Sequence, residues 1–354
     1  MNLAMVDKIA KAVLYEGYML YPYRPSSVKN QQRWNFGVLC PRSYSEAQNG
    51  SDAWTMQTEC LVEGSSLTRI EVRVRFLQLM ARSLGELTMP ANELLPDEKP
   101  EFRPAERLAV GGRVYQPWQE AVERETTLPI CNIEALIHAP LPESFTFPAR
   151  EEFEHVRDRG GPITGVVIRE QRTLQGMVDI SSERVGEDLF KVRVSVRNRT
   201  PFAGAQHASR ENALLSSLVS AHTILGLQNG KFVSLLAPPE QLSELTARCK
   251  NVGTWPVLVG EEGECDTVLS SPIILYDYPQ IAPESAGDLF DGTEIDEILS
   301  LRIMTLTDDE KREMSQSDER ARQMLERTET MPVEQFMKLH GVLRGLRPLR
   351  EESK

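Results

Sequence analysis

The stretch from Thr68 to Met80 constrains the fold more than any other part of the chain, because it alternates regularly between apolar and charged side chains. The apolar positions are Ile70, Val72, Val74 and Phe76. Successive side chains of a β-strand point to opposite faces, so this period of two predicts a half-buried strand.

Three further runs of β-type sequence follow and are joined by polar turns: Ile163–Arg169, Thr173–Ile180 and Leu189–Arg197. Runs of this length with short connections favour antiparallel pairing with one face in water. The sequence Val110-Gly111-Gly112-Arg113 predicts a hairpin turn. Two shorter strands are expected at Pro256–Val259 and Ser271–Tyr276, and the proline-rich stretch Leu87–Pro104 predicts a loop.

The hydrophobic period changes after Ser209. Leu214, Leu218, Ala221 and Leu225 fall near helical spacing, which predicts a helix over 209–226 with Ser209 as its N-cap. Other helices are expected at Met1–Leu14, at 238–250, and from Thr293 to Met304. Thr307-Asp308-Asp309-Glu310 fits a capping box, and Pro332 can begin a last helix.

These elements predict an α+β fold. Residues 1–281 form an antiparallel β-sandwich-like body with inserted helices, either as one unit or as two β units that divide near 130–150. Residues 282–354 form a mostly helical, acidic C-terminal segment. From Pro283 onward the chain has 17 acidic and 11 basic residues, which suits a solvent-exposed arm or a partner-binding surface.

Composition excludes several classes of function. The net charge is −12 and the pI is near 5.1, whereas nucleic acids and anionic membranes attract basic surfaces. The N-terminus lacks the apolar core of a secretory signal, and the most apolar stretch, Ala213–Leu227, is too short to span a bilayer. The five cysteines are scattered and odd in number. We therefore expect a cytoplasmic protein with reduced thiols and no membrane insertion.

No motif for cofactor or metal chemistry stands out. The sequence has no phosphate-binding glycine loop, no clustered histidines and no GxSxG nucleophile elbow. Glu151 and His155 would share one face of a helix, but this is also the spacing of a surface pair. The acidic residues between Asp288 and Glu297 lack the alternation of a calcium loop. We predict no cofactor, no metal and no catalytic residue, although a triad of residues distant in sequence stays open.

One cluster near the N-terminus has the residue types of a binding surface: Tyr15, Tyr18, Tyr21, Tyr23, Arg24, Arg33 and Trp34. Tyrosine, tryptophan and arginine are enriched in the energetic centres of protein interfaces. The same side chains could instead close one end of a β-sandwich. We predict partner binding for this cluster and keep the structural role as its alternative.

Two stretches of the sequence carry a resemblance. One runs from Leu14 to Leu39, and the other joins Asn251–Gly260 to Ile274–Ser285 and Asp288–Leu299. Together they resemble an uncharacterised bacterial family whose members are usually encoded beside NiFe-hydrogenase subunits. The resemblance implies a setting but transfers no site residue.

The resemblance and the missing motifs lead to one function hypothesis and two alternatives. The hypothesis is a non-catalytic accessory, assembly or scaffold protein that binds a hydrogenase subunit or maturation intermediate. The first alternative is a hydrolase-like enzyme, in which His138, His207 or His222 would lie near both a nucleophile and a carboxylate. The second is a structural subunit of a larger complex. The sequence leaves the oligomeric state open.

Overall fold

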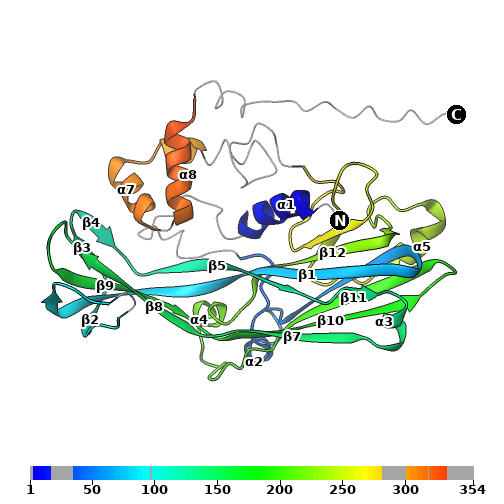
Figure 1. The fold of residues 1–354 in the computed structure, drawn as a ribbon, viewed down its shortest axis with the longest axis horizontal. Helices are drawn as coiled ribbons and strands as arrows, with labels where there is room; N and C mark the ends of the chain where they lie inside the picture. Colours follow the sequence, from blue (N-terminus) through cyan, green and yellow to red (C-terminus); the bar gives the residue numbers. More distant parts are fainter. Residues whose placement is uncertain (1–2, 17–34, 96–97, 281–299, 318, 333–354) are drawn as a thin grey trace.

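The computed structural model describes residues 3–16, 35–95, 98–280, 300–317 and 319–332, and they form a mostly antiparallel sheet with helices (Figure 1). The α+β prediction is confirmed. Twelve strands join one sheet: β1 Thr55–Ala91, β2 Phe102–Ala105, β5 Trp118–Thr127, β6 Cys131–Asn132, β7 Leu141–Phe147, β8 Arg150–Arg157, β9 Ile163–Gln171, β10 Leu174–Arg184, β11 Leu189–Asn198, β12 Val219–Phe232, β13 Trp255–Leu258 and β14 Thr267–Ser271. A separate hairpin contains β3 Leu108–Val110 and β4 Arg113–Tyr115.

The described residues contain fewer helices than strands, and most of the helices are short. They are α1 Leu3–Glu16, α2 Arg42–Ala47, α3 Ala135–His138, α4 Arg210–Leu214, α5 Ser243–Ala247, α7 Asp308–Ser317 and α8 Glu319–Thr330, with a 3-10 turn at Glu240–Leu242. Residues 300–304 are also helical. In the described part of the chain, no helix is both long and apolar enough to cross a membrane.

Strand β1 organises the sheet. It pairs with β11 over Thr55–Glu63, with β12 over Val62–Leu77, with β5 over Arg73–Arg82 and with β9 over Ala81–Ala91. The predicted strand at 68–80 is therefore confirmed as the middle of a longer one. The loop predicted over 87–104 is wrong at both ends, because β1 continues to Ala91 and β2 begins at Phe102, where main-chain pairing outweighs the prolines.

The other predicted β elements are mostly confirmed. β9, β10 and β11 match the three central runs, and β10 pairs antiparallel with β11. Gly111 and Gly112 form the predicted hairpin turn with φ of +60° and +77°, which glycine adopts without strain. β13 matches its prediction closely. The strand expected at 271–276 is wrong, because β14 ends at Ser271.

The helix predicted over 209–226 is wrong, although Ser209 is an N-cap. Its Oγ accepts the Asn212 N–H at 3.2 Å, but α4 ends at Leu214 and β12 begins at Val219. The residues from Val219 to Leu227 are all buried. A strand covered on both faces lacks the alternation of apolar and exposed polar residues that marks a half-buried strand, so its apolar positions can also fit helical spacing. The helix predicted over 238–250 is shorter than predicted and consists of the 3-10 turn Glu240–Leu242 and α5.

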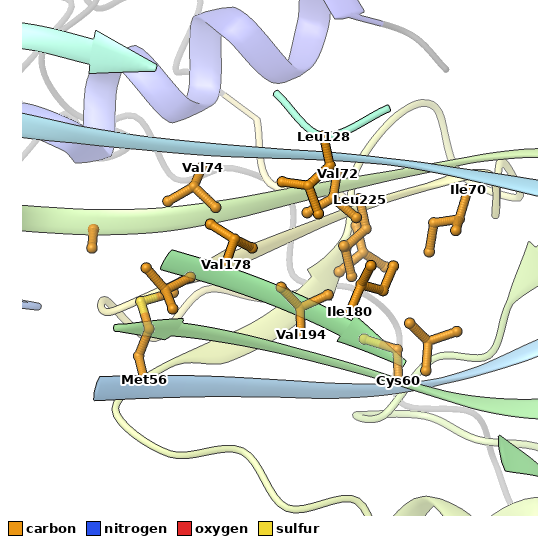
Figure 2. Packing of buried hydrophobic residues seen from close by; sticks show 14 of the residues in the cluster. Met56, Cys60, Ile70, Val72, Val74, Leu128, Val178, Ile180, Val194 and Leu225 are labelled. Atoms are coloured by element: carbon orange, nitrogen blue, oxygen red, sulfur yellow. The ribbon is translucent and has the colours of Figure 1, made fainter. Parts of the chain in front are cut away.

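The main core lies between strands of different parts of the sheet. Val72, Val74 and Leu225 of β1 and β12 face Val178 and Val194 of β10 and β11 across one cluster (Figure 2). An aromatic group closes it, with the Phe76 ring centroid 5.7 Å from that of Phe145 and 5.8 Å from that of Phe147. All these strands belong to one hydrogen-bonded sheet, so the sandwich-like arrangement stays a prediction.

Helices cover the opposite face of β1 and β12, as Figure 1 shows for α1, α7 and α8. Val6, Ile9 and Val13 of α1 pack on Ile224 and Leu269. Further along, residues of the C-terminal helices pack on β1 and β12: Ile303, Met314, Met324 and Leu325 on Leu77, Leu79 and Val219. This explains why β12 is buried on both faces.

The capping box before α7 is confirmed in both directions. Thr307 N–H donates to Glu310 Oε2 at 2.8 Å, and Glu310 N–H donates to Thr307 Oγ1 at 3.3 Å. The predicted start at Thr293 and the predicted helix from Pro332 lie outside the described residues, apart from Ser300–Met304 and Pro332 itself. The proposed domain limits at 281 and near 130–150 stay predictions.

Candidate functional site

Most of the predicted binding cluster lies outside the described residues. This applies to Tyr18, Tyr21, Tyr23, Arg24, Arg33 and Trp34. Tyr15 belongs to α1 by its backbone. The binding role of the cluster therefore stays a prediction.

The structure tests the weak metal candidate directly. Glu151 and His155 lie on the strand β8, not on a helix, where residues four apart are about 13 Å apart along the chain. His155 Nε2 contacts the Glu98 carbonyl at 2.8 Å, and Glu151 accepts Lys99 Nζ at 3.2 Å. Among the described residues, no three His, Cys, Asp or Glu side chains gather as metal ligands.

His222 is the centre of a buried polar cluster on β12. Its Nδ1 lies 2.7 Å from the Ser220 carbonyl and its Nε2 lies 3.2 Å from Ser271 Oγ. Ser271 Oγ also accepts the Ile273 N–H at 3.0 Å. The carbonyl can only accept, so Nδ1 carries the proton and the Ser271 hydroxyl donates to Nε2.

Electrostatics keep this imidazole neutral. Burial lowers the pKa of His222 to about 4, and the nearby Arg75 cation also lowers it, against the Ser220 hydrogen bond. Arg75 is opposite His222 in the β1–β12 register and binds Asp7 at 2.8 Å and Glu125 at 2.6 Å. The two acids therefore neutralise the arginine, not the histidine.

This arrangement does not form a hydrolytic triad. A Ser–His pair is present, but Nδ1 meets a main-chain carbonyl instead of a carboxylate, and Ser271 and His222 have no exposed surface. In the described part of the chain, no hydrogen bond joins the side chain of His138 or His207 to a nucleophile. The hydrolase alternative gains no geometric support from these contacts.

Three of the thiols are also poor nucleophiles. Burial raises the pKa of Cys40 and of Cys249 to about 11, and it raises the pKa of Cys60 further. A thiol with a raised pKa holds little thiolate at neutral pH. All five cysteines are free.

A group of exposed apolar side chains lies around β13, the last strand on one side of the sheet. We call it the β13-edge patch and define it as Leu236, Trp255, Ile274 and Tyr276, whose exposed fractions are 55%, 45%, 71% and 85%. Single exposed apolar residues are common, but four around one strand edge form a surface.

Hydrogen bonds hold the segments of the patch together. The chain leaves β14 at Ser271, opposite Trp255, and returns to β13 where Tyr278 N–H donates to the Leu258 carbonyl at 2.7 Å. The Asp277 carboxylate accepts Leu258 N–H at 2.8 Å and the Ser234 hydroxyl at 2.5 Å. Ser234 Oγ accepts the Leu236 N–H at 3.2 Å. The patch is thus built on anchored backbone.

The returning segment presents apolar side chains to both sides. Ile273 and Leu275 pack with the residues of α1, whereas Ile274 and Tyr276 between them are exposed. The sequence does not indicate this site, because an apolar run predicts a buried strand and no local pattern marks one of its faces as exposed.

Neither a known protein-family model nor a curated protein matches this chain. Among the described residues, the feature most informative about function is the β13-edge patch.

Proposed function

We propose that this chain is a non-catalytic accessory protein that binds another protein. The observation that supports the proposal is the β13-edge patch. When a partner covers large apolar side chains, their burial stabilises the complex. Little conformational entropy is lost on binding, because the backbone that carries them is already ordered. Tyr276 and Trp255 are of the residue types that dominate interface energetics.

The partner we propose is a NiFe-hydrogenase subunit or maturation intermediate. The support is the resemblance to a family encoded beside such subunits, together with the aromatic and basic composition between Tyr15 and Trp34. A structural subunit of a hydrogenase-containing complex would use the same kind of surface. We propose a cytoplasmic location, since free cysteines are typical of reducing compartments.

Co-purification tests the proposal. The tagged full chain is expressed in a host that makes the hydrogenase, and is purified gently at low salt. We expect hydrogenase subunits or their precursors to co-purify in defined stoichiometry, and deletion of the gene to lower hydrogenase activity. Recovery of the chain alone, together with unchanged hydrogenase activity in the deletion strain, would refute the proposal.

A further inference from the structure

The negative charge of this protein is concentrated in one segment of the sequence, which contains most of the β13-edge patch. From Asn251 to Leu301 the sequence contains eleven Asp and Glu residues and no Lys, Arg or His. The charge of this window is −11, and that of the whole chain is −12. The rest of the chain is almost neutral, and five of the eleven acids lie among the described residues.

Three of these acids lie on the turn that follows β13. Glu261, Glu262 and Glu264 are exposed. The turn is tied to the patch because Cys265 Sγ lies 3.7 Å from the Tyr278 hydroxyl, two residues after Tyr276. The turn thus forms an acidic border to the apolar side chains.

Lys231, a basic residue near this turn, does not neutralise the negative charge of the turn. Phe232 N–H donates to the Cys265 carbonyl at 2.6 Å, which brings Lys231 near. Lys231 is opposite Glu63 in the β1–β12 register, so an acid already faces it across the strands. The three carboxylates of the turn leave a net negative border.

We infer that the β13-edge patch binds a protein segment that carries both apolar and basic side chains. This inference rests on the proposed function and names the surface and the chemistry of the partner. The apolar side chains supply contact area, whereas the acidic border favours lysine and arginine and speeds association. A second copy of this chain fits poorly, because a two-fold contact through the patch would bring two acidic turns close together.

Binding of defined peptides to the full chain tests the inference. The probes are fluorescein-labelled peptides of equal length that alternate leucine with lysine, leucine with glutamate, or serine with lysine. Fluorescence anisotropy should show binding of the leucine–lysine peptide about tenfold tighter than that of the other two. Its affinity should fall as salt is added.

Two pairs of variants locate the binding surface. Ile274→Ser with Tyr276→Ser removes apolar area, and Glu261→Gln with Glu262→Gln removes charge; each should weaken binding of the leucine–lysine peptide about tenfold. Met89→Ser and Glu86→Gln are matched controls, because both side chains are exposed on the far part of β1. The controls should stay within about twofold of the wild type. All changed side chains are exposed, so an unchanged melting temperature verifies folding, and the charge variant remains a test if the apolar one fails to fold.

Three results of the peptide and sedimentation measurements would overturn the inference. They are equal binding of the leucine–glutamate peptide, equal weakening in the Met89 and Glu86 controls, and self-association in sedimentation that the patch variants abolish. Hydrogenase subunits that co-purify with the Ile274/Tyr276 variant as well as with the wild type would leave the proposed function intact and refute only this surface. A chain that binds the peptides selectively but never co-purifies with hydrogenase subunits would refute the hydrogenase partner and leave the surface standing.

Discussion

At the scale of single residues, His222 shows how burial decides what a titratable group can do. The sequence predicts that His222 lies on a helix and leaves a catalytic role open. The structure places it on a strand, without exposed surface, between the Ser220 carbonyl and the Ser271 hydroxyl. Both ring nitrogens are satisfied only when the imidazole is neutral. Ser271 lies 49 residues away, so no local pattern could indicate the pair.

The buried His222 predicts a loss of stability in acid. Its pKa is about 4 in the folded state and about 6.5 when unfolded. Between these values the unfolded chain binds more protons, so the free energy of unfolding falls as pH drops from 6.5 to 4, by about 3 kcal/mol in total, and changes no further below the folded pKa. Urea denaturation at pH 7 and at pH 4.5 measures this decline.

A variant separates His222 from other titrating groups. His222→Asn can still donate a hydrogen bond to the Ser220 carbonyl but cannot be protonated, so its stability should be lower at pH 7 and should decline less toward pH 4.5. His138→Asn, at an exposed position, should decline like the wild type. An equal decline in the wild type and His222→Asn would contradict the assignment.

At the scale of elements, the sequence correctly predicted those elements whose structure depends on residues nearby in the chain. The strand at 68–80, the hairpin at Val110–Arg113 and the capping box at Thr307–Glu310 each rest on interactions or patterns within a few residues. The prediction for the residues of β12 was wrong because their burial on both faces depends on α1 and β10, which lie far away in sequence.

The pairing of β7 with β10 gives a prediction at this scale. Gly176 lies opposite Phe145, and a Cβ at Gly176 would come within 2.1 Å of the Phe145 ring. Gly176→Ala should therefore push Phe145 away from Phe76 and cost about 1–3 kcal/mol of stability. Chemical denaturation measures this cost.

Gly161→Ala is the matched control for that substitution. The nearest atom to its new Cβ, on Asp158, would be 3.6 Å away, an ordinary contact. We expect a change within about 0.5 kcal/mol. If both alanine variants were equally stable, the close contact of Phe145 on Gly176 would not be a determinant of the β7 position.

At the scale of the whole molecule, the C-terminal helices are part of the same packed structure as the sheet. Met314 has no exposed surface and lies in one cluster with Leu14 of α1 and Leu77 of β1. The sequence predicts a mostly helical, acidic segment from residue 282 onward, and the charge pattern could not show that described residues of its helices pack on β1.

This packing can be tested with a pair of methionines. Met314→Asp places a charge in the cluster and should weaken the docking of α7 and α8 by roughly 3 kcal/mol. Limited proteolysis should then cleave between 300 and 332 much faster than in the wild type. Met304→Asp, at a residue that is 56% exposed, should be cleaved at the wild-type rate. Equal rates in all three proteins would show that the helices do not depend on this cluster.

The sequence by itself determined the strands with a period of two, the hairpin glycines and the helix caps, because each depends on contacts within a few residues. Only the tertiary structure decided that Val219–Phe232 is a strand covered on both faces. It alone also brought Leu236, Trp255, Ile274 and Tyr276 to one edge of the sheet, beside the acidic turn. The physical reason is that the burial of a residue depends on segments that are distant in sequence and meet in space. The sequence around an apolar residue looks the same whether that residue is covered by a helix or exposed to solvent.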